Sequence, residues 1–520
     1  MTNTESTERG RQVDIHPYFG GFILETLTIG LYGDSRNAIR EYLQNGFDAL
    51  QSAIDEGHIS SEEAQIVIEM STDRLAVRDN GVGLSCNMAV STLTAIGASS
   101  KSYRREAGFR GIGRLAGIAF CDKLIFSTKA AGEERGTKVI LNAAGLRHDM
   151  SPSRGGHRPL DELLLDNIRA FETEEPDIND HYFEVVLIGF KNAPAECMDP
   201  ARMVDFVSQV APVSYDDDFP FAKDILGEAT RRKTAIDTVR IVVRANGEET
   251  AVYKPYRNEF AVGKDPVMLT KCELRESPSG RWWGWIGEKA EPGAYKDEKT
   301  RAIRVRVRNI QIDDTHVMRQ IFESIPGAPS YGRFNDWFVG EIFVEPTLLV
   351  PNARRDGFED DEQWQAVRSE LSELCSGLGR SAYEISKKNQ HSISKLAQDA
   401  RTLEAETKKI ISAKALSADK LIQLSGAVTK LQRRVSRAVR HADHEVTSQL
   451  RSIDNRLLDI KAKAVKTLGI TNLRDPDEIG EQAQKEVIKM LMQAFRSKLD
   501  PATYSKVARI AIEVLGTDEF

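Results

Sequence analysis

The sequence predicts an α/β protein built from an α/β sandwich domain, a mixed α+β domain and a helical coiled-coil tail. Three observations support this prediction. Polar and glycine-rich motifs alternate with helical and strand-like apolar stretches over roughly the first 155 residues, strand-like runs prevail from about 160 to 360, and a 4-3 apolar alternation follows. With 520 residues and 41% hydrophobic content, the chain is long enough to bury several cores.

The first motif lies on a predicted amphipathic helix. Glu41, Asn45 and Asp48 stand at positions i, i+4 and i+7, so a helix projects all three from one face. Four apolar residues favour the opposite face: Ile39, Leu43, Leu50 and Ile54. One face of the helix is therefore predicted to hold the functional residues, and the other is predicted to pack against the protein core.

The second motif follows a predicted strand. Asp79 comes after the apolar alternation of residues 75–78, and Gly81 and Gly83 behind it allow the backbone to turn and to approach a ligand closely. A carboxylate at a strand end can bind the exocyclic amine of a purine. On this segment alone, an ordinary Asp-Asn-Gly turn is an equally good interpretation.

The third motif is a glycine-rich loop that runs from Gly108 through Gly111 to Gly113 and enters an apolar stretch predicted to be helical. Its backbone N–H groups and helix N-terminus suit a polyphosphate. The loop lacks the Gly-Lys-Ser/Thr ending of a P-loop and is weak evidence by itself. The three motifs in this order predict an ATP pocket.

The order and spacing of these motifs resemble the GHKL (Bergerat-fold) ATPase superfamily, which includes the ninety-kilodalton heat-shock chaperone, MutL, gyrase B, MORC proteins and histidine kinases. The resemblance covers roughly the first 360 residues and is closest to the N-terminal and middle domains of the chaperone. It implies a Bergerat-type sandwich that binds ATP and Mg²⁺. The ATP-binding residues that it implies are Asn45, Asp48, Asp79, Gly81, Gly83, Lys101, Gly108, Gly111, Gly113 and Thr137.

The resemblance also implies individual roles. Glu41 would be the general base that orients and deprotonates the attacking water, and Asn45 would bind magnesium through a hard amide oxygen. Lys101 would contact the phosphates from an ATP lid, and Thr137 would place a hydroxyl near the adenine or its bridging water. Each residue also has a simpler interpretation. Glu41 could be a solvated helix residue, Lys101 an exposed surface charge and Thr137 an ordinary strand residue.

A fourth match lies far downstream, at residues 349–356. In the chaperone's middle domain an arginine three residues after an asparagine reaches the ATP phosphates, and the spacing from Asn352 indicates Arg355, with Arg354 as the neighbouring alternative. A planar guanidinium suits bidentate phosphate contact. Charge supplied by a second domain would make hydrolysis depend on domain docking.

We expect four regions along the chain. They are a GHKL ATP-binding domain at 1–155, a middle or transducer domain at 156–360, a helical coiled-coil region at 361–468 and a C-terminal helical segment at 469–520. Within 156–360 the pattern predicts a helix and four strands, at 200–210, 238–245, 281–286, 302–312 and 337–344.

The helical region differs from the rest of the chain in charge and pattern. The whole chain has a net charge of −7, yet residues 380–466 hold 19 Lys and Arg against 9 Asp and Glu, with Tyr383 the single aromatic residue. Such a region can contact nucleic-acid phosphates, although solvated helices often look the same. Its apolar seam, from Leu424 to Ala464, should pair in an intramolecular hairpin or with a second chain, and we favour a homodimer.

Other features narrow the class of protein. The five cysteines have no paired spacing, which favours reduced thiols. No apolar run approaches membrane-spanning length and no apolar leader opens the chain, so we expect a cytoplasmic protein without membrane association. A phosphoacceptor-histidine helix and a metal-binding strand module are both missing from the pattern, which disfavours a histidine kinase and a complete topoisomerase.

Two functions stay open. In the first, magnesium-dependent ATP hydrolysis closes a dimeric chaperone-like clamp on a protein client. In the second, a MORC/MutL-like, ATP-gated clamp acts on nucleic acid, in a setting such as bacterial genome or phage defence. The tail shows neither the chaperone's dimerisation-domain pattern nor its acidic co-chaperone-binding ending, so a standard folding chaperone is disfavoured.

Overall fold

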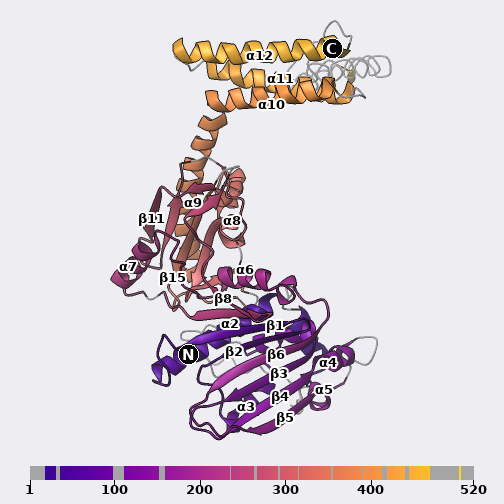
Figure 1. Ribbon diagram of the computed structural model, residues 1–520, viewed down its shortest axis with the longest axis vertical. Helices are drawn as coiled ribbons and strands as arrows, with labels where there is room; N and C mark the ends of the chain where they lie inside the picture. The colour runs from indigo at the N-terminus through magenta and orange to yellow at the C-terminus, as the bar shows by residue number, and fades with distance from the viewer. Residues whose placement is uncertain are drawn as a thin grey trace. The chain divides into compact units, whose positions relative to one another are not determined.

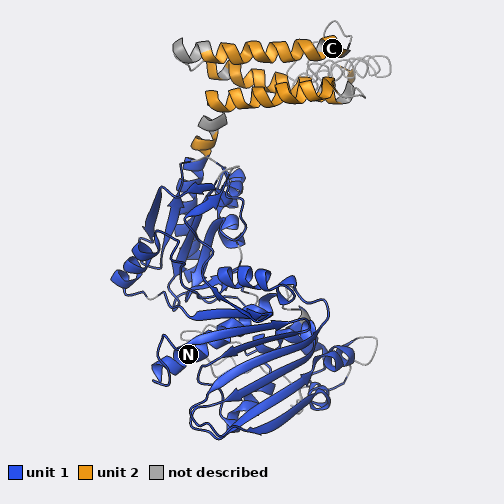
Figure 2. Ribbon diagram, in the orientation of Figure 1, with its two compact units in different colours: residues 1–382 blue, residues 383–520 orange. Residues whose placement is uncertain are grey.

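The computed structural model separates the chain into two compact units, residues 1–382 and 383–520 (Figure 2). It describes residues 18–30, 36–97, 111–151, 158–234, 236–262, 266–290, 293–313, 315–352, 355–390, 392–412, 418–439, 444–468, 503, 504 and 507. Within the described residues, the larger unit holds two large sheets, each with an apolar core, and a two-stranded sheet formed by 259–261 and 266–268. The smaller unit is helical.

The first sheet has eight strands in the order β5-β4-β3-β6-β2-β1-β7-β8 (Figure 1). Their bounds are Gln65–Ser71 (β1), Arg74–Asp79 (β2), Cys121–Lys129 (β3), Arg135–Asn142 (β4), Ile168–Glu174 (β5), Tyr182–Phe190 (β6), Arg240–Ala245 (β7) and Glu248–Val252 (β8). All neighbours are antiparallel except β1 and β7, which are parallel.

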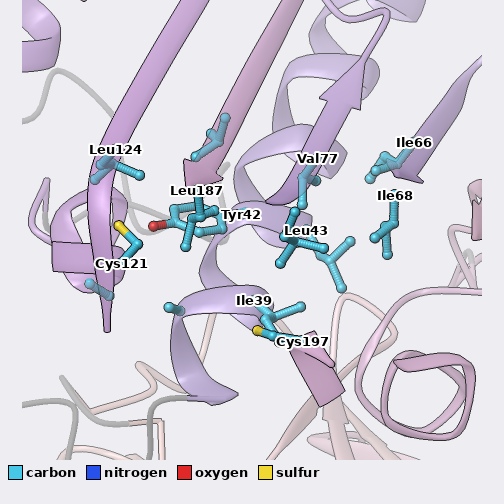
Figure 3. Close-up of a cluster of buried hydrophobic side chains, with 14 of the residues drawn as sticks. Ile39, Tyr42, Leu43, Ile66, Ile68, Val77, Cys121, Leu124, Leu187 and Cys197 are labelled. Atoms are coloured by element: carbon cyan, nitrogen blue, oxygen red, sulfur yellow. The ribbon is translucent and has the colours of Figure 1, made fainter. Parts of the chain in front are cut away.

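One face of this sheet is covered by helices. Alternate residues of the strands join a single apolar cluster, because successive side chains of a strand point to opposite faces. The helices that contribute to it include α2 (Arg36–Asp55), α4 (Ala143–Met150) and α6 (Pro200–Val210). Leu43 of α2 lies beside Val77 of the sheet and Ile39 lies beside Cys197 (Figure 3), and both belong to this apolar cluster, which confirms the predicted apolar face of that helix.

The remaining elements of this region are short. They are α1 (Phe22–Glu25), the π-helix η1 (Thr26–Gly30), α3 (Cys86–Thr94), the 3₁₀ helix η2 (Gly113–Ala119), α5 (Leu160–Asn167) and the 3₁₀ helix η3 (Ala195–Cys197). The predicted helix at 200–210 and the strand at 238–245 are confirmed as α6 and β7.

The sheet continues past the boundary predicted near residue 155. β5, β6, β7 and β8 all come later in the chain, and β6 pairs with both β2 and β3 in the middle of the sheet. The division into 1–155 and 156–360 is therefore wrong, because the turn-rich segment is a connection within the first domain. The second domain takes in the chain after β8 together with helix α7 (Ala222–Arg232), which lies between β6 and β7 in the sequence.

The second domain is built on a five-stranded sheet in the order β11-β12-β15-β13-β14. Its strands are Lys271–Glu276 (β11), Trp282–Glu288 (β12), Ala302–Val307 (β13), Ile310–Ile312 (β14) and Val339–Val344 (β15). The strand predicted at 302–312 is instead a hairpin, because Arg308 and Asn309 turn the chain with positive φ angles of 50° and 60°.

Helices complete the second domain. The further elements are α7 (Ala222–Arg232), β9 (Glu259–Ala261), β10 (Pro266–Met268), α8 (His316–Glu323), the 3₁₀ helix η4 (Pro329–Trp337) and α9 (Glu362–Gln390). α8 and the first half of α9 bury apolar side chains such as Phe322 and Leu371 in the core of this sheet.

The smaller unit is a three-helix bundle of α10 (Ile393–Ile411), α11 (Ala418–Val439) and α12 (His444–Leu468). The predicted apolar seam is its core: Leu424, Val428, Leu431 and Val435 pack with Leu450, Ile453, Leu457 and Ile460, and with Leu396 and Ala400 of α10. The seam is thus covered within one chain, as in the intramolecular alternative. A homodimer stays a prediction, but the apolar seam would not be its interface.

Two further expectations can be compared with the described residues. All five cysteines are free thiols. Among the helices of the described residues, none combines the length and the apolar character that crossing a membrane would require. Most of the C-terminal segment predicted at 469–520 lies outside the described residues.

Candidate functional site

A cavity of about 740 Å³, a volume that includes open solvent at its mouth, runs along α2. Its lining residues are Asn45, Asp48, Ala49, Ser52, Asp79, Val82, Gly83, Leu84, Thr92, Leu93, Arg114 and Phe183. The structure therefore brings together Asn45, Asp48, Asp79 and Gly83 of the predicted set. Glu41 lies one helical turn before Asn45 on the same helix.

Asp79 ends β2 and points to the helix-covered face, because it continues the alternation of Leu75 and Val77. The residue is 5% exposed. Its Oδ1 accepts a hydrogen bond of 2.9 Å from the N–H of Gly81. Helix α2 passes close by, since a Cβ at Gly46 would lie 3.3 Å from Asp79 Oδ2. Asp79 is thus an acid of the cavity lining that is held in place, as purine recognition would require.

The two glycines of this motif are needed for close packing of the protein itself. A Cβ at Gly81 would lie 2.6 Å from the carbonyl carbon of Ala49. Gly83 has a φ of +63°, and a Cβ there would lie 2.0 Å from the carbonyl oxygen of Lys129. Close approach of protein backbone therefore requires both glycines, and their close approach to a ligand stays a prediction.

Side chains distant in sequence fix the loop after Asp79. The Asn80 amide bonds to the main chain at and just before the start of β1, at 2.9 Å each. His181 Nδ1 lies 2.7 Å from the carbonyl oxygen of Gly81, and the N–H of Leu84 donates to Thr128 Oγ1 at 2.8 Å. Sequence reasoning missed His181 and Thr128, because their roles depend on β3 and β6 lying beside β2.

Thr137 is not brought to the cavity. Asp79, Phe183, Thr128 and Thr137 form one row across β2, β6, β3 and β4, all on the same face of the sheet. At about 4.8 Å per strand, Thr137 lies roughly 14 Å along the row from Asp79. Phe183 occupies the neighbouring position and lines the cavity instead. The predicted adenine contact of Thr137 therefore finds no support in this geometry.

The glycine-rich loop meets the cavity at its other end. Gly111 has a φ of +71°, and a Cβ at Gly113 would lie 2.0 Å from Glu41 Oε2, so only glycine lets this backbone pass the carboxylate. The helix expected after the loop is the seven-residue 3₁₀ helix η2, which gives no α-helical N-terminus for phosphate. Lys101 and Gly108 lie outside the described residues.

The loop that carries Arg355 is shaped by the asparagine of its motif. The Asn352 side chain exchanges two hydrogen bonds with Asp356, at 2.7 Å to the carboxylate and 3.2 Å from the N–H. Arg355 adopts a left-handed backbone with a φ of 55°, and its carbonyl accepts from the N–H of Asp313 at 2.8 Å. These bonds support a conformation that non-glycine residues rarely adopt. Arg354 lies outside the described residues.

Arg355 reaches from the second domain to the first. Its Nε donates a 2.8 Å hydrogen bond to Glu41 Oε1, and the two residues are 7% and 8% exposed. A charge-assisted contact of this kind is strong where water is excluded. The structure thus brings together the two residues predicted to act in hydrolysis, with the carboxylate itself as a partner of the arginine.

Asn45 is the residue that could hold magnesium. It lines the cavity between the Glu41 and Asp79 ends of α2. Within the part of the chain that the structure describes, no cluster of three or more His, Cys, Asp or Glu side chains has a metal-binding arrangement. A single amide ligand fits Mg²⁺, which is usually held by one or two protein oxygens together with substrate phosphates and water.

Comparison with known families adds one finding. Residues 33–161 match the family described as "Histidine kinase-, DNA gyrase B-, and HSP90-like ATPase". The matched range holds α2, the Asp79 loop, the glycine-rich loop and β4, but it ends before β6 and before Arg355. Phe183 and Arg355 therefore lie outside the matched range, and the structure brings both to the region of the site.

Proposed function

Residues 33–161 form a GHKL-type ATPase domain, and we therefore propose that this protein hydrolyses ATP, with Mg²⁺, in a cycle controlled by docking of its second domain. The contact between Arg355 and Glu41 carries the proposal. This contact links Glu41, the residue expected to activate water, with Arg355, a cation of the second domain. Neither residue could meet the other unless the two domains were docked.

The adenine would lie at the Asp79 end of the cavity and the phosphates at the Glu41 end. α2 sets this direction, since Asp79 packs beside Gly46 whereas Gly113 packs beside Glu41. The apolar lining near Asp79, including Leu84 and Phe183, suits a planar base. The Asp79 carboxylate would accept a hydrogen bond from its exocyclic amine.

Glu41 would take a proton from the attacking water as the oxygen of that water bonds to the γ-phosphorus and ADP leaves. While Oε1 accepts from Arg355, that oxygen is occupied and the base is restrained. Phosphate oxygens compete for the same guanidinium, and their charge develops in the transition state. Arg355 would then change partner, which would free the base and supply positive charge in one step.

Magnesium would be held by Asn45 and the nucleotide phosphates. When bound, the ion would neutralise phosphate charge and orient the phosphate chain. The amide oxygen of Asn45 adds no charge of its own to that site. Asp48, one turn further along α2, lines the same cavity and is 5% exposed.

We propose further that ATP-dependent docking closes a chaperone-like clamp on a protein client. Many cations of the helical bundle already have acidic partners, as in the pairs of Arg434 with Asp399 at 2.9 Å and Lys463 with Asp459 at 2.6 Å. Such pairing leaves less charge for phosphate backbones. The positive net charge of this region still supports the alternative, a clamp that acts on nucleic acid.

Replacing Glu41 by Ala tests the chemistry. Turnover of ATP should fall about 100-fold or more, because a general base typically contributes a factor of 10² to 10⁴. Affinity for ATP should stay within a few-fold, since the Asp79 and Asn45 contacts are kept. The matched control is Glu56→Ala, an exposed glutamate just beyond α2. Normal turnover in the Glu41 variant would refute the proposal.

The class of client is tested by measuring which macromolecule the full chain binds and retains, with and without ATP. Duplex DNA and an unfolded model protein can be compared at several salt concentrations. ATP-dependent retention of the protein alone supports the chaperone-like clamp. Retention of DNA that falls steeply with salt would instead favour the nucleic-acid clamp, because bound phosphates release counterions.

A further inference from the structure

The ATP cavity contains a cation that none of the motifs singles out. Arg114 follows Gly113 directly and lines the cavity. Its Nε donates to the carbonyl oxygen of Leu93 at 3.4 Å and its Nη2 donates to that of Ala95. Among the described residues, no Asp or Glu side chain forms an ion pair with Arg114. Burial lowers the pKa of this guanidinium, which shows that its surroundings disfavour the charge that it carries.

The contacts of Arg114 place it at the phosphate end of the cavity. The Tyr42 hydroxyl donates to the carbonyl oxygen of Arg114 at 3.3 Å, and Tyr42 is the residue after Glu41. At the opposite end, the N–H of Val82 donates to the carbonyl oxygen of Ala49 at 3.2 Å. Between Glu41 and Gly46, the residue beside Asp79, the helix rises by about 7.5 Å, at 1.5 Å per residue. The backbone of Arg114 therefore lies nearer to the Glu41 end of α2 than to the Asp79 end.

A second arginine of the same domain shows what a purely structural role looks like. Arg147 also donates to two main-chain carbonyls, those of Ile118 and Cys121. In addition it has an acidic partner, Asp122, at 3.4 Å, and it is not part of the cavity lining. Arg114 makes similar contacts with main-chain carbonyls, but no acidic side chain of the described residues forms an ion pair with it. A partly buried charge without a counter-ion is costly, so a ligand that brings negative charge would be favoured.

We propose that Arg114 is a phosphate-binding residue, and that it makes the affinity of this cavity depend on the number of phosphates in the nucleotide. The inference rests on the proposed ATP binding. Arg114 would supply charge-assisted hydrogen bonds to the phosphate chain from the side of η2, whereas Arg355 approaches from the second domain. The first arginine would act in binding and the second in turnover.

The test is calorimetric binding of adenosine, AMP, ADP and ATP to the full chain and to Arg114→Gln. The glutamine keeps an N–H donor for the Leu93 and Ala95 carbonyls but has no charge. We expect adenosine to bind the variant within about twofold of the unchanged chain. ADP and ATP should bind about 10- to 100-fold more weakly, the range for losing a hydrogen bond to a charged group.

Arg114→Lys and Arg147→Gln complete the experiment. The lysine variant should recover part of the ATP affinity, because it restores charge without the planar fork. The Arg147 variant should keep the normal ratio between ADP and adenosine affinities. Equal weakening of adenosine and ATP in Arg114→Gln would overturn the inference and leave Arg114 as a positioning residue. If the unchanged chain bound no adenine nucleotide, the proposed function itself would fail.

Discussion

Two buried Arg–Glu pairs can be compared within the part of the chain that the structure describes, and their surroundings differ. In the second domain, Arg306 donates to Glu341, and both side chains are fully buried. The same carboxylate accepts from Lys254 at 2.9 Å, and Arg306 also donates to the carbonyl oxygen of Asn309 at 2.9 Å. The second pair joins two domains. Arg355 of the second domain contacts Glu41 of the first, one helical turn before the residue Asn45 that lines the cavity.

The difference separates a structural charge pair from one that can change partner. Arg306 and Glu341 are surrounded by further fixed donors and acceptors, including the Gln209 carbonyl and the Tyr215 hydroxyl, so exchange would leave a buried charge unpaired. Glu41 and Arg355 are nearly as buried, but a phosphate could replace Glu41 as the partner of Arg355. Variants at the two sites should therefore affect different quantities.

The largest effect is expected from Arg306→Met, which keeps much of the side-chain volume and removes the charge. Leaving Glu341 without its main partner should destabilise the second domain by about 3–5 kcal/mol. Denaturant unfolding followed by tryptophan fluorescence would measure this, since Trp285 packs in the same domain. Arg355→Met is the matched comparison and should lower the unfolding free energy by less than Arg306→Met, because Glu41 lies one helical turn before Asn45, which lines the open cavity, and its carboxylate can turn toward water there. Equal destabilisation of both variants would remove the distinction.

The same Arg355→Met variant should lose catalysis. We expect turnover to fall about 100- to 1000-fold, as for removal of a preorganised donor to transition-state charge. ATP affinity should stay within a few-fold. Steady-state kinetics with a separate binding measurement would check both values. Turnover that rose instead would mean that the arginine only restrains Glu41.

The third prediction concerns acid. Burial alone would raise the pKa of Glu341, but Arg306 and Lys254 together lower it to about 2. Its stabilising contribution is thus complete above the unfolded pKa near 4.5 and is lost as pH falls toward 2. The loss should reach a few kcal/mol, since each pKa unit corresponds to about 1.4 kcal/mol. Unfolding measured from pH 6 to about 2.5 should show this loss, and Glu341→Gln should flatten the profile.

Asp79→Asn should weaken nucleotide binding by about 10- to 100-fold, because a hydrogen bond to a charged acceptor is replaced by one to a neutral amide. Turnover at saturating ATP should change less than affinity. Parallel calorimetry and kinetics would separate the two quantities. An unchanged affinity for adenosine would show that the base does not bind at this carboxylate.

The smallest effect is expected from Thr137→Val, which should leave ATP affinity within about twofold because β3 and β6 separate Thr137 from Asp79. Phe183→Ala is its counterpart and should weaken binding several-fold through lost apolar contact. Both can be measured in one titration series. A strong effect of the threonine variant alone would restore the original prediction.

The sequence allowed correct prediction of features that depend on local spacing. The face of α2 with Glu41 and Asn45, the strand before Asp79 and the helix at 200–210 follow from periods of 3.6 and 2 residues. Arg355 was singled out through the resemblance to the chaperone's middle-domain loop, by its spacing from Asn352. Each of these signals is contained in a short stretch of sequence, about one or two helical turns or one strand in length.

The features that were missed depend on long-range pairing. Phe183 lies beside Asp79 because β6 inserts between β2 and β3, and no local signal shows this order. The apolar seam around Leu431 predicted burial but could not name the partner that buries it. Arg114 was not singled out because its meaning depends on the cavity around it.

The position of β6 in the sheet has a consequence for how the protein is made. Until residues 182–190 leave the ribosome, β2 and β3 each present an unpaired edge, and Phe183 cannot complete the cavity beside Asp79. At about 5–20 residues per second, the ribosome needs roughly 5 to 20 seconds to pass from β2 to the end of β6. The nascent chain therefore spends that interval with exposed strand edges and an incomplete nucleotide site, so nucleotide can stabilise the domain only after this central strand has been inserted.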